Sequence, residues 1–185
     1  MKKTFLILAA VALLSSCNNS GTSADTKKDT SSTSNMSTMS STESKADRNR
    51  QTALASVQAA NAHDANGVLK DASTDIVDYG DGSGKPAKNI DSLKAGISEW
   101  LKAFPDVKGD NLEAFSNADG SKVIVVGEWT GTFKGDLMGM KPTGKSFKYW
   151  DGDIFTFNDD GKITSHRGIQ SFMTTMNQVG AKMRK

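Results

Sequence analysis

The clearest hydrophobic pattern in the chain lies between residues 90 and 105. Its large apolar side chains recur three and four residues apart: Ile90, Leu93, Ile97, Trp100, Leu101 and Phe104. Side chains at these spacings share one face of an α-helix, so the pattern predicts an amphipathic helix. Pro105 cannot continue a helix and marks its end. A weaker apolar stripe predicts another helix over residues 48–61, followed by a short one over residues 68–72.

After Pro105 the apolar residues alternate with polar ones. This period of two predicts four strands, over residues 107–116, 122–133, 146–157 and 162–172. Short links ending in Gly120 and Gly161 are typical of hairpins, and Gly127 and Gly131 indicate a bulge or bend inside the second strand. Helices followed by an antiparallel meander predict an α+β domain, with the sheet wrapped around three N-terminal helices. Such a bent sheet leaves a hollow that suits a small apolar or amphipathic molecule.

The N-terminus carries an export signal. Lys2 and Lys3 precede an apolar run over residues 4–14, which as a helix would span about 16 Å, too short for a hydrocarbon core of about 30 Å. This is typical of a signal peptide. The run ends in Leu14-Ser15-Ser16-Cys17, which resembles the lipobox of bacterial lipoproteins, so we expect a signal peptide over residues 1–16 and lipidation at Cys17. We therefore expect an exported protein held to a bacterial membrane by its acyl chains.

Composition places the function in the C-terminal part. Residues 18–45 hold fifteen Ser or Thr among 28 positions, so residues 17–45 are expected to form a flexible tether. The folded domain is then expected over residues 46–185. The chain has 23 basic and 21 acidic side chains, and without Lys2 and Lys3 the two numbers are equal. That balance argues against a nucleic-acid partner. A single cysteine excludes an intrachain disulfide and any site with several cysteine ligands.

Several motifs have a structural explanation. Residues 139–146 match the Walker A pattern, but an aromatic, strand-like segment follows instead of a helix, so a connection between antiparallel strands is expected. Twelve residues counted from Asp78 end at Asn89 rather than at the Glu that closes a calcium loop. His63 is expected to cap a helix end, and His166 is a candidate pocket residue. We expect no metal site and no cofactor.

Asp153 is the strongest candidate for chemistry. In the predicted strand it shares a face with Phe147, Tyr149, Asp151, Phe155 and Phe157, and an aromatic-rich face is normally buried. Burial can raise the pKa of a carboxyl group by several units, which would make Asp153 an acid or base near neutral pH. If the strand instead lay at a rim, Asp153 would be solvated.

Short segments distributed over roughly residues 47–180 resemble the SnoaL-like polyketide cyclase family. They are Ala60-Asn61-Ala62-His63-Asp64, Ala103-Phe104-Pro105-Asp106, Gly131-Thr132-Phe133-Lys134-Gly135, the loop over residues 137–145 and the strand and turn over residues 153–163. The resemblance implies the cone-shaped fold shared with nuclear transport factor two, ketosteroid isomerase and scytalone dehydratase. It also implies that the Walker-like string is a loop near the pocket mouth, and that a homodimer can form through the sheet.

The resemblance leaves the activity open. SnoaL-type cyclases use an aspartate on the last strand as general acid/base, and that position falls at about Arg167-Gly168, where no carboxylate stands. Ketosteroid isomerase keeps a neutral carboxylic acid at the position of Asp153. Its second carboxylate, the base, would fall near Asp78 or Asp81.

Two hypotheses follow. The first is a membrane-anchored module that binds a small apolar or amphipathic molecule. The second is a cofactor-independent cyclase, isomerase or dehydratase with Asp153 as acid, Asp81 or Asp78 as base, and His166 or Tyr149 as a polar contact. In either case, ligand contacts are expected from Tyr149, Asp151, Phe155, Trp129, Trp100 and Met138.

Overall fold

Six strands form one curved sheet in the order β2-β1-β6-β5-β4-β3. The computed structural model describes residues 43–182. The strands are β1 (Ala72–Asp78), β2 (Ala87–Lys88), β3 (Lys108–Ser116), β4 (Lys122–Thr132), β5 (Ser146–Phe157) and β6 (Ile163–Gly168). Strands β3 to β6 make the antiparallel meander expected from the alternation. Strand β1 was not predicted, and it pairs in parallel with β6, so the sheet is mixed.

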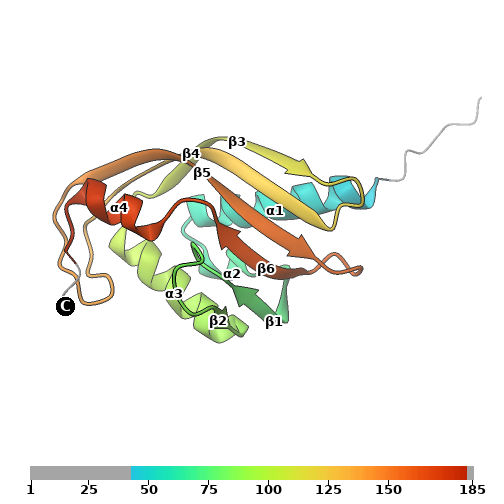
Figure 1. Cartoon of the computed structure of the whole chain (residues 1–185), viewed down its shortest axis with the longest axis horizontal. Coiled ribbons are helices and arrows are strands. Elements are labelled where there is room, and N and C mark those ends of the chain that lie inside the picture. Colours follow the sequence, from blue (N-terminus) through green and yellow to red (C-terminus); the bar gives the residue numbers. More distant parts are fainter. Residues whose placement is uncertain (1–42, 183–185) are drawn as a thin grey trace, which may run out of the picture. The chain divides into compact units, whose positions relative to one another are not determined.

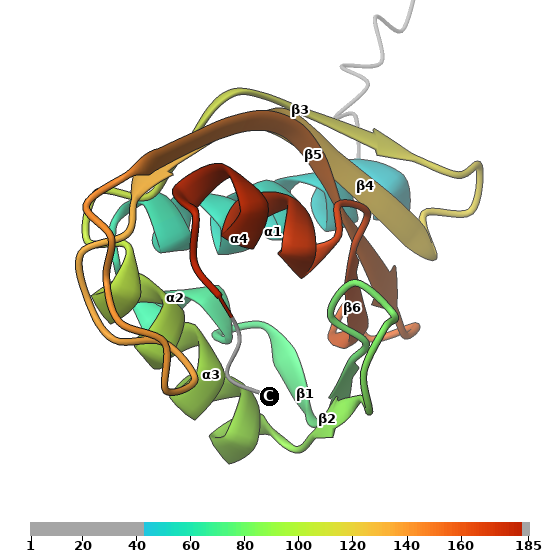
Figure 2. The same ribbon diagram turned by 60° about the vertical axis from the view of Figure 1, so that its left-hand side comes forward.

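Four helices accompany the sheet: α1 (Lys45–Asn61), α2 (Ala65–Val68), α3 (Ile90–Ala103) and α4 (Phe172–Val179). Ser44 caps α1 by accepting from the amide of Asp47, and Asn89 caps α3 by accepting from that of Ser92. The short α2 lies three residues earlier than expected. Figure 1 shows α1 beneath β3 and β4, and Figure 2 shows α4 inside the arch of the sheet.

Two groups of buried side chains hold these layers together. One joins α1 and the start of α3 to the inner faces of β1, β4, β5 and β6, with Val57, Leu93, Val125 and Phe155 among its members. The other surrounds Phe104 at the end of α3 and includes Phe133, Phe147 and Met176. Because α4 contributes Met176 and Val179, both fully buried, it closes the second group.

The bend expected at Gly127 has a local cause. The register between β3 and β4 shifts between Asp110 and Glu113, where β3 contains one more residue than β4. Asn111, inside this bulge, has a φ of 53°, which asparagine tolerates better than most residues. A Cβ atom on Gly127 would lie 2.9 Å from the carbonyl oxygen of Asp110. The bulged strand therefore approaches the backbone of Gly127 more closely than any side chain allows.

The Walker-like string lies in the connection from β4 to β5, as expected, and Ser146 begins β5. The hydroxyl of Thr143 in this loop donates to the carbonyl oxygen of Val179 at 2.6 Å, which ties the loop to the end of α4. Among residues 43–182, no helix is long and apolar enough to cross a membrane. The expected signal peptide, Cys17 and most of the tether lie outside the described residues.

Candidate functional site

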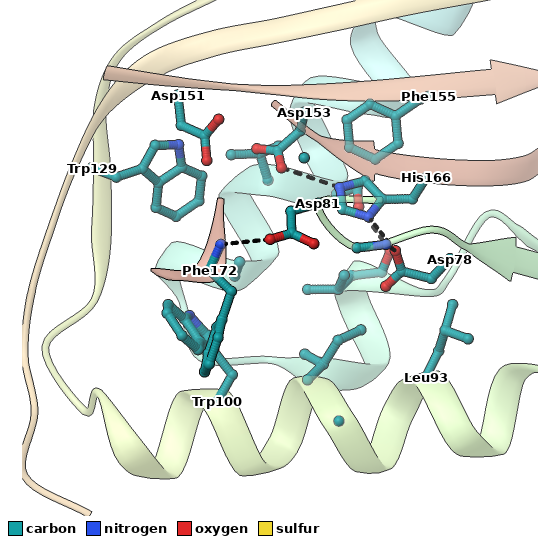
Figure 3. A pocket seen from close by; sticks show the side chains of 18 of the residues that line it. Asp78, Asp81, Leu93, Trp100, Trp129, Asp151, Asp153, Phe155, His166 and Phe172 are labelled. Atoms are coloured by element: carbon teal, nitrogen blue, oxygen red, sulfur yellow. Dashed lines mark hydrogen bonds and ion pairs between the residues drawn. The ribbon is translucent and has the colours of Figure 1, made fainter. Parts of the chain in front are cut away.

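A cavity of about 390 Å³ lies between the concave face of the sheet, α3 and α4 (Figure 3). Its size is within the range of pockets that take small molecules. Most of its wall is apolar or aromatic, and the apolar part includes Val57, Leu69, Ile76, Leu93, Ile97, Leu101, Val107 and Ile163. Polar side chains gather on the side formed by β1, β5 and β6. The cavity thus has an apolar body and one polar wall.

Strand β5 supplies the polar wall because its side chains alternate. Phe147, Phe155 and Phe157 are buried on the inner face, whereas Lys148 and Trp150 point outward and are exposed. Asp151 and Asp153 have the same parity as the buried rings and therefore point inward. Both line the cavity. The structure thus places Asp153 on the enclosed side of the sheet.

Asp78, His166 and Asp153 form a chain of hydrogen bonds along this wall. Nδ1 of His166 lies 3.0 Å from Oδ1 of Asp78, and Nε2 lies 3.1 Å from Oδ1 of Asp153 (Figure 3). The side chains are 28%, 27% and 18% exposed, respectively. The parallel pairing of β1 with β6 puts Asp78 beside His166, and β5 brings Asp153 to the other ring nitrogen. The His166 ring also packs on Phe155, with centroids 5.2 Å apart.

The two carboxyl groups keep His166 protonated. Burial favours the neutral ring, but the hydrogen bonds and charges of Asp153 and Asp78 outweigh it and raise the pKa of His166 to about 10. Burial also acts on Asp78, yet the hydrogen bond and charge of His166 hold the pKa of that carboxyl below its usual value. An imidazolium donates through both nitrogens, so His166 acts here as a fixed cation and double donor.

Asp151 is in a different environment. Its Oδ1 accepts from the amides of Gly152 and Gln170, at 2.6 and 2.8 Å. Burial nevertheless raises the pKa of Asp151 above its usual value, against the effect of backbone hydrogen bonds from Gln170, Gly152 and Ile169. The nearby charge of Asp153 adds to the rise. Asp151, which was expected as a ligand contact, is therefore a cavity carboxyl group whose pKa lies above its usual value.

Aromatic side chains surround these carboxyl groups. Trp100, Trp129, Tyr149 and Phe155 all line the cavity, as expected from the sequence. The hydroxyl of Tyr149 lies 2.6 Å from that of Thr175 on α4. Burial raises the pKa of Tyr149 to about 12, although the Thr175 contact opposes the rise, so the phenol stays neutral.

Two expected site residues, Met138 and Asp81, differ from the expectation in position or in role. Met138 does not line the cavity; its side chain is 70% exposed in the loop between β4 and β5, where alternation no longer applies. Asp81 does line the cavity, but its carboxylate accepts from the amide of Phe172 at 2.9 Å and from the amide and hydroxyl of Ser83. The hydrogen bonds from Ser83 and Phe172 lower the pKa of Asp81. Asp81 therefore anchors the start of α4 and is poorly suited to take a proton.

Sequence reasoning missed the contribution of α4 and of the turn before it. Gln170, Ser171, Phe172 and Thr175 all line the cavity, although residues up to 172 were expected to continue the last strand. A signal for the helix was present: Phe172, Met176 and Val179 recur at helical spacing, after a possible cap at Ser171 and before Gly180. Within residues 43–182, no group of three or more His, Cys, Asp or Glu is arranged to hold a metal ion.

Comparison with known families identifies the domain. The family described as SnoaL-like polyketide cyclase matches residues 50–179, which is more than half of the chain. The chain belongs to the SnoaL-like family. In this SnoaL-like domain, the resemblance places the catalytic acid of SnoaL-type cyclases at about Arg167-Gly168, and Gly168, which lines the cavity, has no carboxyl group. Arg167, beside it, points outward and lies over the ring of Tyr79, 5.0 Å from its centroid.

Solved structures support the same fold. A candidate polyketide cyclase of Xanthomonas campestris pv. campestris is 17% identical with a TM-score of 0.66, covering 74% of this chain and 99% of that one. One of Pseudomonas putida KT2440 is 20% identical with a TM-score of 0.64, covering 71% and 97%. AclR, a candidate hydroxylase of Streptomyces galilaeus, is 26% identical with a TM-score of 0.59, covering 71% and 80%. No curated protein matches the chain. The cone-shaped fold shared with nuclear transport factor two is thereby confirmed.

Proposed function

We propose that this SnoaL-like domain binds a small apolar or amphipathic molecule in its cavity. The observation that carries the proposal is the cavity itself, which combines a volume of about 390 Å³ with an apolar body and one polar wall. Such a wall can orient a guest through a few hydrogen bonds while the apolar surface supplies most of the affinity. Oδ1 of Asp151 and of Asp153 is engaged, so the second oxygen of each is available to the guest.

The test is to fill the cavity with a side chain. Gly96 lies on the cavity face of α3, and a Cβ atom there would meet nothing within 4 Å. We expect Gly96→Leu to keep the fold and to weaken binding of the uncharged dye N-phenyl-1-naphthylamine at least about ten-fold, since a leucine side chain would occupy much of the dye's space. Ala95→Leu, at the neighbouring exposed position of the same helix but outside the cavity lining, is the matched control. Equal dye binding by both variants would contradict the proposal.

Acid–base catalysis without a cofactor is a second candidate function. The observation that favours it is that Asp153 and Gly168 are direct partners across β5 and β6. The side chain of Asp153 is thus attached directly across the ladder from the position that holds an acid in SnoaL-type cyclases. Held by the imidazolium of His166, it can exchange a proton with a carbon next to a carbonyl group in a bound substrate.

A substrate panel tests this second function. Once a compound is turned over, Asp153→Asn should lower kcat by about two to four orders of magnitude, as is typical when a proton-transfer group is removed. Asp160→Asn, a change of the same kind at an exposed turn, should have no effect. Full activity of Asp153→Asn on such a compound would rule out a catalytic role for Asp153.

We also propose that the protein is exported and anchored through a lipid on Cys17. The support is the sequence around Leu14-Ser15-Ser16-Cys17, in which the chain's only cysteine stands where lipidation requires it. Cells fed radiolabelled palmitate should incorporate label into the wild-type protein and not into Cys17→Ser. Equal labelling of both proteins, or of neither, would contradict the anchor.

A further inference from the structure

The charges around the cavity are unevenly distributed. Four carboxyl groups line it, those of Asp78, Asp81, Asp151 and Asp153, while no lysine or arginine does so among the described residues. His166 is the one cation on the wall, and it is shared between Asp78 and Asp153. The nearest basic residue along β6, Arg167, points to the outer face. The wall therefore carries more negative than positive charge.

Among residues 43–182, no basic side chain forms an ion pair with Asp151. The amides of Gly152 and Gln170 donate to its Oδ1, and the backbone amide of Ile169 acts on the same carboxyl group more weakly. A carboxylate withdrawn from water without a counter-ion is unfavourable, and the raised pKa of Asp151 has this cause. A positively charged group placed near Oδ2 would remove the penalty. An anionic group placed there would increase it.

The aromatic residues of the same cavity suit a cation as well. Figure 3 shows the Trp129 ring next to Asp151, and Trp100 with Phe172 on the facing side. The rings of Trp100 and Phe172 are 6.4 Å apart between centroids. The face of an indole or benzene ring attracts organic cations, and the attraction grows when water is excluded. A cavity with aromatic faces and an unpaired carboxyl group at one end combines both interactions.

We propose that the guest is an organic cation, an amine or quaternary ammonium compound with an apolar body, whose charged group lies between Asp151 and the Trp129 ring. This inference rests on the proposed function, since it names the class of molecule that the cavity binds. It excludes carboxylates and phosphates as preferred guests. Asp153 borders the same space and adds to the attraction.

Three probes of nearly equal shape test the charge preference. They are (2-naphthylmethyl)trimethylammonium, its uncharged carbon isostere 2-neopentylnaphthalene, and the anion 2-naphthylacetate. Binding to the purified protein can be followed by tryptophan fluorescence, because Trp100 and Trp129 line the cavity. We expect the cation to bind about ten-fold more tightly than the isostere, and the anion to bind most weakly.

The variant Asp151→Asn identifies the group responsible. Asparagine keeps the oxygen that accepts from Gly152 and Gln170 but removes the charge, so the preference for the cation over the isostere should fall several-fold. Asp160→Asn removes one charge from an exposed turn and should leave the preference unchanged.

Equal affinity for cation and isostere, or a preference that survives Asp151→Asn, would overturn the inference and leave the binding function intact. Failure of all three probes and of the uncharged dye would overturn both.

Discussion

Asp78 and His166 are 88 positions apart in the sequence, yet Oδ1 of the first lies 3.0 Å from Nδ1 of the second. They are direct partners in the parallel ladder between β1 and β6. The first strand of the sheet thus fixes the histidine of the last one, which in turn holds Asp153. The polar wall of the cavity is therefore built by the long-range closure of the sheet.

Removing the histidine should expose this dependence. His166→Asn leaves Asp78 and Asp153 close together without the cation between them, and both are largely buried. We expect the free energy of unfolding to fall by about 2–3 kcal/mol at pH 7, which urea denaturation can measure. His63→Asn is the control, because His63 is exposed and has a φ of 57°, which asparagine accepts. A loss no larger than that of the control would show that the array does not stabilise the fold.

Stability should also depend on pH in a defined direction. The pKa of His166 is about 10 in the folded protein, against a reference value of 6.5. Between these values the folded chain holds a proton on His166 that the unfolded chain has lost. The contribution of His166 to the free energy of unfolding is therefore complete below pH 6.5 and decreases as the pH rises towards 10. One such proton gives at most about 1.4 kcal/mol per pH unit.

The measurement is urea denaturation at several pH values between 6 and 10. Asp78 has the opposite sign, because its pKa is lowered on folding, and its contribution is lost in acid. His166→Asn should flatten the alkaline slope. The same slope in the wild type and in this variant would mean that another group is responsible.

These two residues also show how far sequence reasoning reaches. Alternation along β5 placed Asp151 and Asp153 correctly on the inner face, because one strand's period is a local property. The pairing of Asp78 with His166 was not predictable, since β1 has only Ile76 fully buried and shows little alternation. Short α4 was not predicted, and its first residue, Phe172, was assigned to the last strand, because eight residues give only two helical turns of pattern. Local periods predicted α1, α3 and the strands β3 to β6, whereas the site depends on how these elements meet β1 and α4.

We expect Asp81 to stabilise the start of α4 and to take no part in proton transfer. Its Oδ2 accepts from the amide of Phe172 and from the hydroxyl of Ser171, at 2.9 and 3.1 Å. Asp81→Ala should cost about 1–2 kcal/mol of stability, as the loss of a helix cap does, and should speed amide hydrogen exchange in α4. Asp119→Ala removes a similar turn contact, to the amide of Ser121, and is the control. Unchanged exchange in α4 would contradict the anchoring role.

Replacing glycine by alanine should change the stability of the fold in opposite directions at Gly127 and Gly96. In Gly127→Ala the new methyl group would lie 2.6 Å from Cδ2 of Leu112 and 2.9 Å from a backbone oxygen, so a loss of about 1–3 kcal/mol is expected. In Gly96→Ala it would meet nothing within 4 Å, and alanine favours the helix, so a gain of about 0.5–1 kcal/mol is expected. Urea midpoints measure both. A neutral Gly127→Ala would mean that the bulge in β3 can move away.

We propose that two copies of the chain associate through the outer face of the sheet. A Cβ atom on Gly152 would touch Ile124, Val126 and Ile169, so these three side chains meet over one glycine. Trp150, 52% exposed, extends this apolar patch along β5. An apolar patch on the outer face of a sheet can pack against its own copy about a two-fold axis, which buries the same residues on both sides.

Sedimentation velocity at micromolar concentration provides the test. We expect a dimer for the wild type and a monomer for Ile169→Glu, because a pair of carboxylates facing each other across the axis would be costly to bury. Met138→Glu adds the same charge at an exposed methionine outside the patch, in the loop between β4 and β5, and should remain dimeric. A monomeric wild type would exclude the dimer. A dimer that persists in Ile169→Glu would mean that the copies pair through a different surface.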